Sequence, residues 1–289
     1  MWSAGCAAPS CATTIRRVRV AVVGHVEWVD FVAVDHVPSA GEIVHAEGSW
    51  AEPAGSGAGA AVQLARLAGG GSFFTALGDD VLGTRSQSRL AELGVAVHAA
   101  RRSEPTRRAF TFLDASAERT ITTLGERLEP HGADQLPWAA LAEADAVYFT
   151  AGDADAARYA RAARVLVGTP RGAQALANVP LDALVYSASD EDERSAAETL
   201  IPPPSLLVAT DGASGGSWRS SRGISGRWTS ALPPGPVVDQ YGAGDCFAAG
   251  LTFGLGSGLS TADAIALAAR CGAWCASGRG PYEGQLRTP

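Results

Sequence analysis

The sequence predicts a three-layer α/β/α fold, in which helices cover both faces of a mostly parallel sheet, with a small β-sheet lid attached. The first observation is that short apolar, β-branched runs alternate with longer helical patterns between residues 146 and 209. Such alternation is typical of βαβ units, whose parallel strands need helical crossovers. The second observation is a stretch at 96–124 in which polar and apolar residues alternate, as in β-hairpins. A chain of 289 residues is long enough for one such domain with a small appendage.

The sheet is expected to begin with the apolar run Val18 to Val23, which ends at Gly24. An apolar stripe predicts a helix over Ala58–Leu67, and a strand is expected over Ser72–Leu77. A loop and a helix should follow between residues 83 and 93. The later elements are strands at 146–149, 165–167, 183–186 and 206–209 and helices at 154–164, 171–176, 190–200, 245–255 and 261–276.

The lid is predicted to come from two insertions, near residues 30–52 and 98–124. In the first, Phe31–Val34 and Ile43–Trp50 alternate in the manner of half-exposed strands. In the second, a turn-forming segment at 114–117 separates two alternating segments and predicts a hairpin. We therefore expect an N-terminal extension over residues 1–17 and a single lidded domain over 18–289.

Charge and composition exclude several functions. The formal net charge is −7, which argues against nucleic acid as a partner, because phosphate binding needs clustered cations. All 23 basic residues are arginine. Schiff-base chemistry and the lysine-containing phosphate loops are therefore excluded. Any phosphoryl transfer must use backbone amides, arginine, metal ions or a helix dipole.

Targeting signals are also missing from the sequence as read. Residues 1–17 lack the basic start and apolar core of a signal peptide, and no apolar run reaches the length that spans a bilayer. The five cysteines form no CxxC pair, so a structural zinc site is not expected. We expect a cytoplasmic protein with no membrane partner.

The stretch Val237–Gly250 carries the most chemical information. Gly242, Ala243 and Gly244 place unobstructed backbone amides at the start of an apolar helix, where the helix dipole favours an anion. Asp245 follows in the first turn, where a carboxylate can accept the proton of an attacking hydroxyl or simply cap the helix. Asp239 can shape the preceding loop or approach a hydrated Mg²⁺.

This stretch resembles the C-terminal signature of the ribokinase-like, or PfkB, family of carbohydrate and nucleoside kinases, Asp-Thr-x-Gly-Ala-Gly-Asp-x-Phe-x-x-Gly. From Asp239 to Gly250 the match fails only at Gln240. Three further segments occur in the family's order: a glycine-rich motif at 54–59, a Val-Gly-x-Asp-x-x-Gly-like segment at 75–83 and a Thr-x-Gly-x-x-Gly turn at 210–215. The resemblance covers residues 18–280 and implies a kinase that uses ATP and Mg²⁺, with a monovalent-cation requirement left open.

The resemblance implies a role for each matching position. Gly242, Ala243 and Gly244 would form an anion hole and Asp245 would be the general base. The other implied contacts fall into two sets. Thr210, Gly212 and Gly215 would line the ATP site, with Gly272 and Cys275 close to the adenine, and Gly55, Gly57 and Gly59 would face the phosphoryl acceptor.

The acceptor half departs from the family pattern. Gly59 occupies the place of a usual Asn, and Val29 that of a usual Asp in the first strand. Because side chains alternate along a strand, Glu27 shares the face of Val29 and is the preferred acidic substrate contact. A bulge would transfer that role to Asp30.

The family's Asn-x-x-Glu element is altered as well. We align it with Ser187-Ala188-Ser189-Asp190, so that Asp190 either organises the water around Mg²⁺ or caps the next helix. Two classes of function stay open. The first is an ATP-dependent kinase for a sugar-like alcohol or, on the same fold, a nucleoside. The second is a nucleotide- or sugar-binding regulator with weak turnover. The apolar faces of the lid make a lid-to-lid homodimer plausible.

Overall fold

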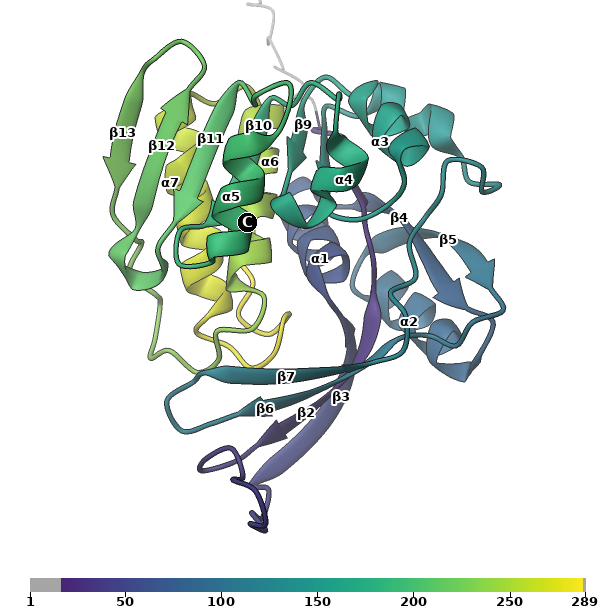
Figure 1. Ribbon diagram of the computed structural model, residues 1–289, viewed down its shortest axis with the longest axis vertical. Coiled ribbons are helices and arrows are strands. Elements are labelled where there is room, and N and C mark those ends of the chain that lie inside the picture. The colour runs from purple at the N-terminus through teal and green to yellow at the C-terminus, as the bar shows by residue number, and fades with distance from the viewer. Residues whose placement is uncertain (1–16, 288–289) are drawn as a thin grey trace, which may run out of the picture.

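The computed structural model describes residues 17–287. Its core is a nine-stranded sheet in the order β13-β12-β11-β10-β9-β8-β1-β4-β5 (Figure 1). Neighbouring strands from β5 to β11 are parallel, and β12 and β13 add an antiparallel edge. The strands are β1 Val20–Val23, β4 Gly71–Gly78, β5 Val95–Arg102, β8 Ala146–Phe149, β9 Leu166–Gly168, β10 Ala183–Ser187, β11 Leu206–Thr210, β12 Gly216–Ser220 and β13 Ser225–Trp228. The predicted α/β layers are confirmed.

Helices cover both faces of this sheet, and the alternation of β1 shows why. Val20 and Val22 point into one core with α1, α6 and α7, whereas Ala21 and Val23 point into another with α3, α4 and α5. Both faces of the strand are thus apolar, as in a buried parallel sheet. The helices are α1 Ser56–Ala68, α2 Val81–Glu92, α3 Ala154–Arg161, α4 Ala173–Leu176, α5 Glu191–Thr199, α6 Ala243–Gly256 and α7 Thr261–Cys275, with 3₁₀ turns at 138–143, 170–172 and 212–214.

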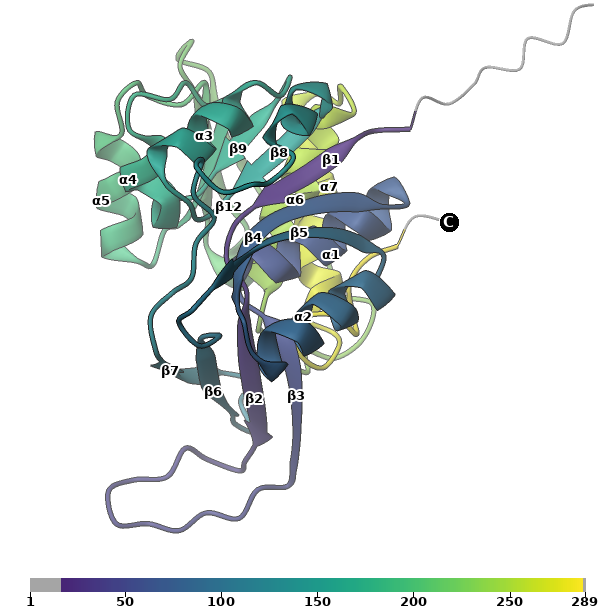
Figure 2. The same ribbon diagram turned by 90° about the vertical axis from the view of Figure 1, so that its right-hand side faces the viewer.

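The lid is a separate four-stranded sheet in the order β3-β2-β6-β7 (Figure 2). Its strands are β2 Glu27–Ala33, β3 Gly48–Ala54, β6 Arg108–Leu113 and β7 Arg119–Leu124. The β6–β7 hairpin matches the predicted one. The small lid core contains Val29, Phe31 and Tyr241, the last of which belongs to the loop before α6. The lid therefore packs directly on the loop that precedes the candidate anion site.

Two boundaries differ from those expected, and one pair of strands was not predicted. Residues 95–102 form β5 of the large sheet, so the second lid segment begins after this strand rather than near residue 98. The first strand pair starts at Glu27 and ends at Ala54, while Ile43 lies in the connecting loop and is 85% exposed. The antiparallel edge strands β12 and β13 were not predicted, because their short Gly- and Ser-rich runs lack a clear apolar period.

Two of the predictions concern the N-terminal extension and membrane-spanning segments. Residues 1–16 of the predicted N-terminal extension lie outside the described residues. Among the helices of residues 17–287, none has the length and apolar character needed to cross a membrane.

Asp80 joins the start of α2 to the root of the lid. Its carboxylate accepts hydrogen bonds from the Gly83 amide at 2.7 Å and from the Thr106 amide and hydroxyl at 2.7 and 2.8 Å. Burial alone would raise the pKa of the Asp80 carboxyl, but these hydrogen bonds together hold it below its ordinary value. The ionised form therefore stabilises both the helix N-terminus and the entry to β6.

Replacing Asp80 by Ala is expected to lower the free energy of unfolding by about 1–3 kcal/mol, because a helix cap and two lid contacts are lost together. Asp79→Ala, whose side chain is exposed, is the matched control and should change it by less than about 0.5 kcal/mol. Urea unfolding measures both. Since the folded-state pKa is lowered, the Asp80 contribution is present above the pKa of the unfolded chain and disappears as the pH falls through the folded pKa. An equal loss at neutral pH in both variants would contradict this role.

Candidate active site

The loop before α6 brings backbone amides together at one point. Gly242, with φ +79°, adopts the left-handed conformation that favours glycine and reverses the chain directly into α6. The buried Asp239 carboxylate holds this loop, because Oδ1 accepts from the Tyr241 amide at 2.7 Å and Oδ2 from the Gly280 amide at 2.8 Å. Both Asp239 oxygens are thus engaged by the backbone, which fits the loop-shaping interpretation better than a metal role.

Asp245 lies in the first turn of α6, facing the start of α1. Its carboxylate hydrogen-bonds with Ser56, and a Cβ built at Gly59 would lie 3.7 Å from the Asp245 Cβ. Burial raises the pKa of the Asp245 carboxyl above its ordinary value, while the Arg171 charge and the Ser56 hydrogen bond oppose the shift. The carboxylate expected from sequence therefore stands between the amides of α6 and the glycine-rich helix.

The glycine-rich segment supplies the opposite wall. Gly57 packs so closely on the segment between β1 and β2 that a Cβ there would lie 2.5 Å from the His25 carbonyl oxygen, so no other residue fits. The Gly55 amide donates to the Tyr241 hydroxyl at 3.2 Å, which ties the N-terminus of α1 to the loop before α6. Gly59, two residues after Gly57 in the same helix, lies next to Asp245.

The alternation of β2 separates the two candidate acidic residues. Glu27 is buried beside Gly55 and pairs with Arg107 across 3.3 Å. Asp30 points to the outer side of the lid, where it pairs with Arg108 at 2.8 Å. Burial raises the pKa of the Glu27 carboxyl, against the neighbouring arginine charges. Because β2 is regular here, the geometry favours Glu27 and leaves Asp30 away from the site.

Asp190 acts as a helix cap in the structure. Its exposed carboxylate accepts from the amides of Asp192 and Glu193 at 3.1 and 3.0 Å. Glu193, three residues later, is the carboxylate that faces inward: it bonds the Ser187 amide at 2.9 Å and Arg171 at 3.0 Å. Its charge acts on Asp245. Our alignment missed Glu193, although the Asn-x-x-Glu spacing recurs from Asp190 to Glu193 and would have found it.

Arg171 was also missed, and no motif marks it. It follows β9 and reaches Glu193 through Nε and the Ser56 hydroxyl through Nη1 at 3.4 Å. This arginine therefore links the α5 side of the site to the α1 side, next to Asp245. The position of the Arg171 side chain depends on how the turn after β9 packs against α1 and α5, and the local sequence does not encode this packing.

The expected nucleotide positions fall into two groups. Thr210, Gly212 and Gly215 form the turn between β11 and β12, where the Asp211 amide donates to the Gly215 carbonyl at 2.8 Å and the Thr210 hydroxyl donates to the Tyr186 carbonyl. Cys275 is fully buried, with its sulfur 3.5 Å from the Tyr241 carbonyl oxygen. It packs behind the loop before α6 rather than lining an open surface.

Gly272 likewise lies at the contact between α7 and α6. A Cβ at this position would lie 3.2 Å from the Ala243 carbonyl oxygen. Gly272 and Cys275 therefore support the anion-site loop from behind, and direct contact of Cys275 with an adenine does not fit this burial.

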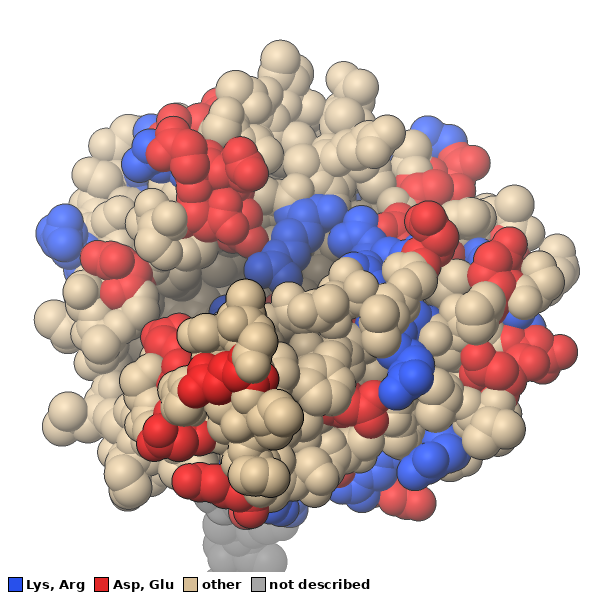
Figure 3. All heavy atoms as spheres, turned by 60° about the horizontal axis from the view of Figure 1, so that its bottom comes forward, with Lys and Arg blue, Asp and Glu red and all other residues tan. Residues whose placement is uncertain are grey.

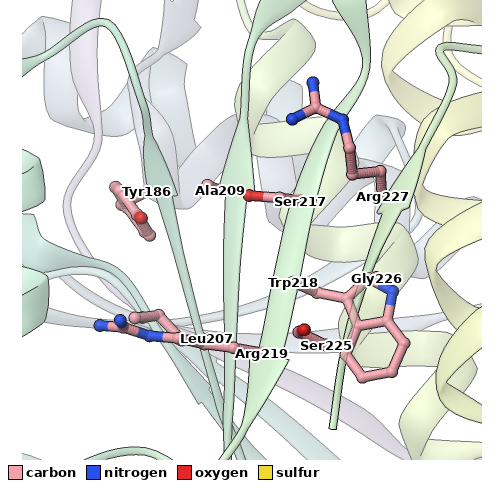
Figure 4. A pocket seen from close by; sticks show the side chains of 9 residues that line it. All are labelled: Tyr186, Leu207, Ala209, Ser217, Trp218, Arg219, Ser225, Gly226 and Arg227. Carbon is pink, nitrogen blue, oxygen red and sulfur yellow. The ribbon is translucent and has the colours of Figure 1, made fainter.

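Two hollows are visible on the surface. Figure 3, which looks onto the lid end, shows a hollow with arginine atoms gathered along its wall. The other, of about 360 Å³, lies on β10–β13 and is lined by Tyr186, Leu207 and Arg219 among others (Figure 4). Leu207 faces the core of α3–α5, whereas Asp245 belongs to α6 on the other face. The hollow on β10–β13 is therefore separate from the candidate site.

Solved structures with this fold include the ribokinase of Giardia lamblia (18% identity, 93% and 96% of the two chains covered, TM-score 0.75). They also include a ribokinase of Arabidopsis thaliana solved with ribose and ATP (19%, 94% and 96%, TM-score 0.73) and the adenosine kinase of Sinorhizobium meliloti (21%, 92% and 96%, TM-score 0.73). A search of curated proteins gave no match. The fold is thus that of the ribokinase-like class.

The family can be stated more closely. The model of the pfkB family of carbohydrate kinases matches residues 18–157 and 151–288. The chain belongs to this family, as its motifs predicted.

Glu193→Gln is expected to lower kcat/KM for an acceptor by roughly 10- to 100-fold, because Arg171 loses its charged partner beside Asp245. Asp192→Asn, on the exposed first turn of the same helix, is the control and should stay within about twofold. Steady-state kinetics of both variants, with ATP varied in one series and the acceptor varied at fixed ATP in another, measure the difference. Full activity of the Glu193 variant would remove Glu193 from the site.

Proposed function

We propose that this protein transfers the γ-phosphoryl group of ATP to a hydroxyl group of a small carbohydrate or sugar-like acceptor. One observation carries the proposal: Asp245 stands at the N-terminus of α6, between the first backbone amides of that helix and the glycine-rich start of α1. A carboxylate in that position can take the hydroxyl proton while the amides stabilise the charge that develops on the phosphoryl group.

The residues around Asp245 prepare it for this role. Burial keeps its pKa raised, so the carboxylate is a stronger base than an exposed one, yet Arg171 and Ser56 limit the rise. The amides at Gly242–Gly244 supply an anion hole made only of backbone, which suits a chain without lysine. The start of the lid at Glu27 lies beside Gly55 in the glycine-rich segment, which we call the acceptor wall. The lid would exclude water when an acceptor is bound.

Magnesium fits the site as an ion held mainly by the nucleotide. Within residues 17–287, no three His, Cys, Asp or Glu side chains cluster to hold a metal. Glu193 is the inward carboxylate that would reach the water around a nucleotide-bound Mg²⁺, which commonly uses one or two carboxylates together with phosphates. When bound, Mg²⁺ would neutralise phosphate charge.

A nucleoside acceptor is the second candidate. The small Gly59 leaves room beside Asp245, and an adenosine kinase shares the fold at a TM-score of 0.73. A binding regulator with weak turnover is disfavoured by the arrangement of Asp245 and its amides. We retain the lid-to-lid dimer as a proposal, since Ile121 and Leu124 of β7 are 42% and 50% exposed.

Asp245→Asn is expected to reduce kcat by about 10²–10⁴-fold, because the amide cannot accept the hydroxyl proton. ATP consumption measured over a panel of pentoses, hexoses and nucleosides tests this. Asp263→Asn, in the first turn of the neighbouring helix α7, is the matched control and should retain activity. Nucleotide binding and the melting temperature of the Asp245 variant should stay near those of the parent, and turnover that survives the substitution would refute the general-base role.

The pH dependence follows from the same carboxyl group. A base works only when ionised, so kcat/KM should fall as the pH drops through the pKa of Asp245. Because that pKa is raised, the acidic limb should lie above the ordinary aspartate value of 3.8. A rate profile between about pH 4 and 8 measures it, and Ser56→Ala, which removes a hydrogen bond to the ionised form, should move the limb further up. An unchanged limb in that variant would contradict the assignment.

A further inference from the structure

Three arginines from separate parts of the chain converge on the acceptor wall. Arg107 comes from the entry to β6, Arg127 from the segment after β7, and Arg171 from the turn after β9. The charges of all three act on both His25 and Glu27, which lie at the start of the lid beside Gly55. This convergence exists only in the folded protein.

The lowered pKa of His25 reflects both its burial and the positive charge of this wall. Its ring is 6% exposed and approaches Gly55, with a ring atom 3.1 Å from a Cβ built there. Burial and then the charges of Arg127, Arg107 and Arg171 lower its pKa to about 3. The imidazole is thus neutral, and its buried Nδ1 makes no hydrogen bond within the described chain.

Arg107 and Arg127 each have an acidic neighbour that engages only part of the guanidinium. Arg107 pairs with Glu27 through Nε alone, at 3.3 Å and without hydrogen-bond geometry, so this buried Nε lacks a hydrogen-bond partner within residues 17–287. Arg127 contacts Glu129 through Nη2 only. Five N–H donors per guanidinium cannot be satisfied by one such contact.

The unused donors distinguish this wall from a site for a neutral sugar. A neutral acceptor offers hydroxyl groups, which satisfy guanidinium donors weakly, whereas a carboxylate or phosphate accepts them in pairs at a matching geometry. A buried donor without a partner is uncommon in folded proteins, and the Arg107 Nε is such a donor within residues 17–287. Arg127, whose side chain is 33% exposed, adds further donors, and an acidic group can accept from both guanidinium groups.

We propose that the acceptor is an anion, a hydroxylated molecule that also carries a carboxylate or phosphate, bound by Arg107 and Arg127 with Glu27 beside them. This inference rests on the proposed function, whose acceptor it narrows. Arg107 and Arg127 hold the acidic group at the lid root, while the hydroxyl to be phosphorylated lies at Asp245. Arg171, already bonded to Glu193 and Ser56, lies nearest the transferring phosphoryl group.

The test compares neutral sugars with acidic derivatives of the same carbon skeleton: glucose with gluconate, fructose with fructose 6-phosphate, and ribose with ribose 5-phosphate. We expect kcat/KM for a charged member to exceed that of its neutral counterpart by roughly 10- to 100-fold, the usual effect of hydrogen bonds to a charged group. The gluconate and phosphate pairs separate a carboxylate from a phosphate. Arg127→Gln should bring the charged-to-neutral ratio close to one.

A second variant and a control guard against misfolding. Arg107→Lys keeps a positive charge near Glu27 but loses the planar fork, so it should weaken the charged acceptor selectively. Arg108→Gln, the next residue along β6, pairs with Asp30 on the outer side of the lid and should leave the ratio unchanged. Unfolding midpoints close to that of the parent confirm that each variant is folded.

The outcomes separate this inference from the proposed function. Turnover of neutral acceptors at rates equal to or above those of their charged counterparts would overturn the inference and leave the kinase intact. If no acceptor is turned over, the binding of each acceptor to the Asp245→Asn variant in the presence of ATP is measured by calorimetric titration. The affinities of the charged and neutral members are then compared. A preference for anions that Arg127→Gln removes supports the inference although the proposed function fails, and equal binding of both members overturns it.

Discussion

The carboxylate of Asp239 is the constraint on which the rest of the site depends. It is buried and accepts the amides of Tyr241 and Gly280, two segments far apart in the chain. This fixes the loop that places Gly242 in its left-handed conformation, directly before the first residue of α6. A buried carboxyl group with both oxygens hydrogen-bonded is a strong geometric restraint, since breaking either bond would leave a buried polar atom without a partner.

Tyr241 extends this restraint to the lid. Its ring packs edge-on against Phe31 of β2 at 4.9 Å, and Phe31 in turn stacks on Trp50 of β3 at 5.1 Å. The Tyr241 hydroxyl accepts the amide of Gly55 at the start of α1. One side chain therefore contacts the lid, the acceptor wall and the anion loop, so that a movement of the lid changes the packing at both walls of the site.

Arginine carries the electrostatics that lysine carries in many phosphate sites. A guanidinium holds its charge at every physiological pH and binds through a rigid fork, so it can position a carboxylate as well as neutralise it. At Asp245 this is the role of Arg171, which is itself held by Glu193 and Ser56. The acceptor wall also uses arginine, but Arg107 and Arg127 keep donors that the described part of the protein does not engage. These donors favour a charged acceptor, whereas Arg171 orients the groups around Asp245.

The sequence by itself determined the α/β layers, the lid hairpin and the helix start that carries Asp245, because each rests on a local period or a short motif whose geometry is set within a few residues. It also separated Glu27 from Asp30 by alternation along one strand. It misplaced the lid boundaries, since pairing of β5 with β4 is non-local, and it passed over Glu193 for Asp190. Only the tertiary structure brought Arg107, Arg127 and Arg171 together beside His25 and Glu27. No local pattern encodes that meeting, because the three residues lie on separate segments whose proximity depends on how the lid folds back onto the sheet.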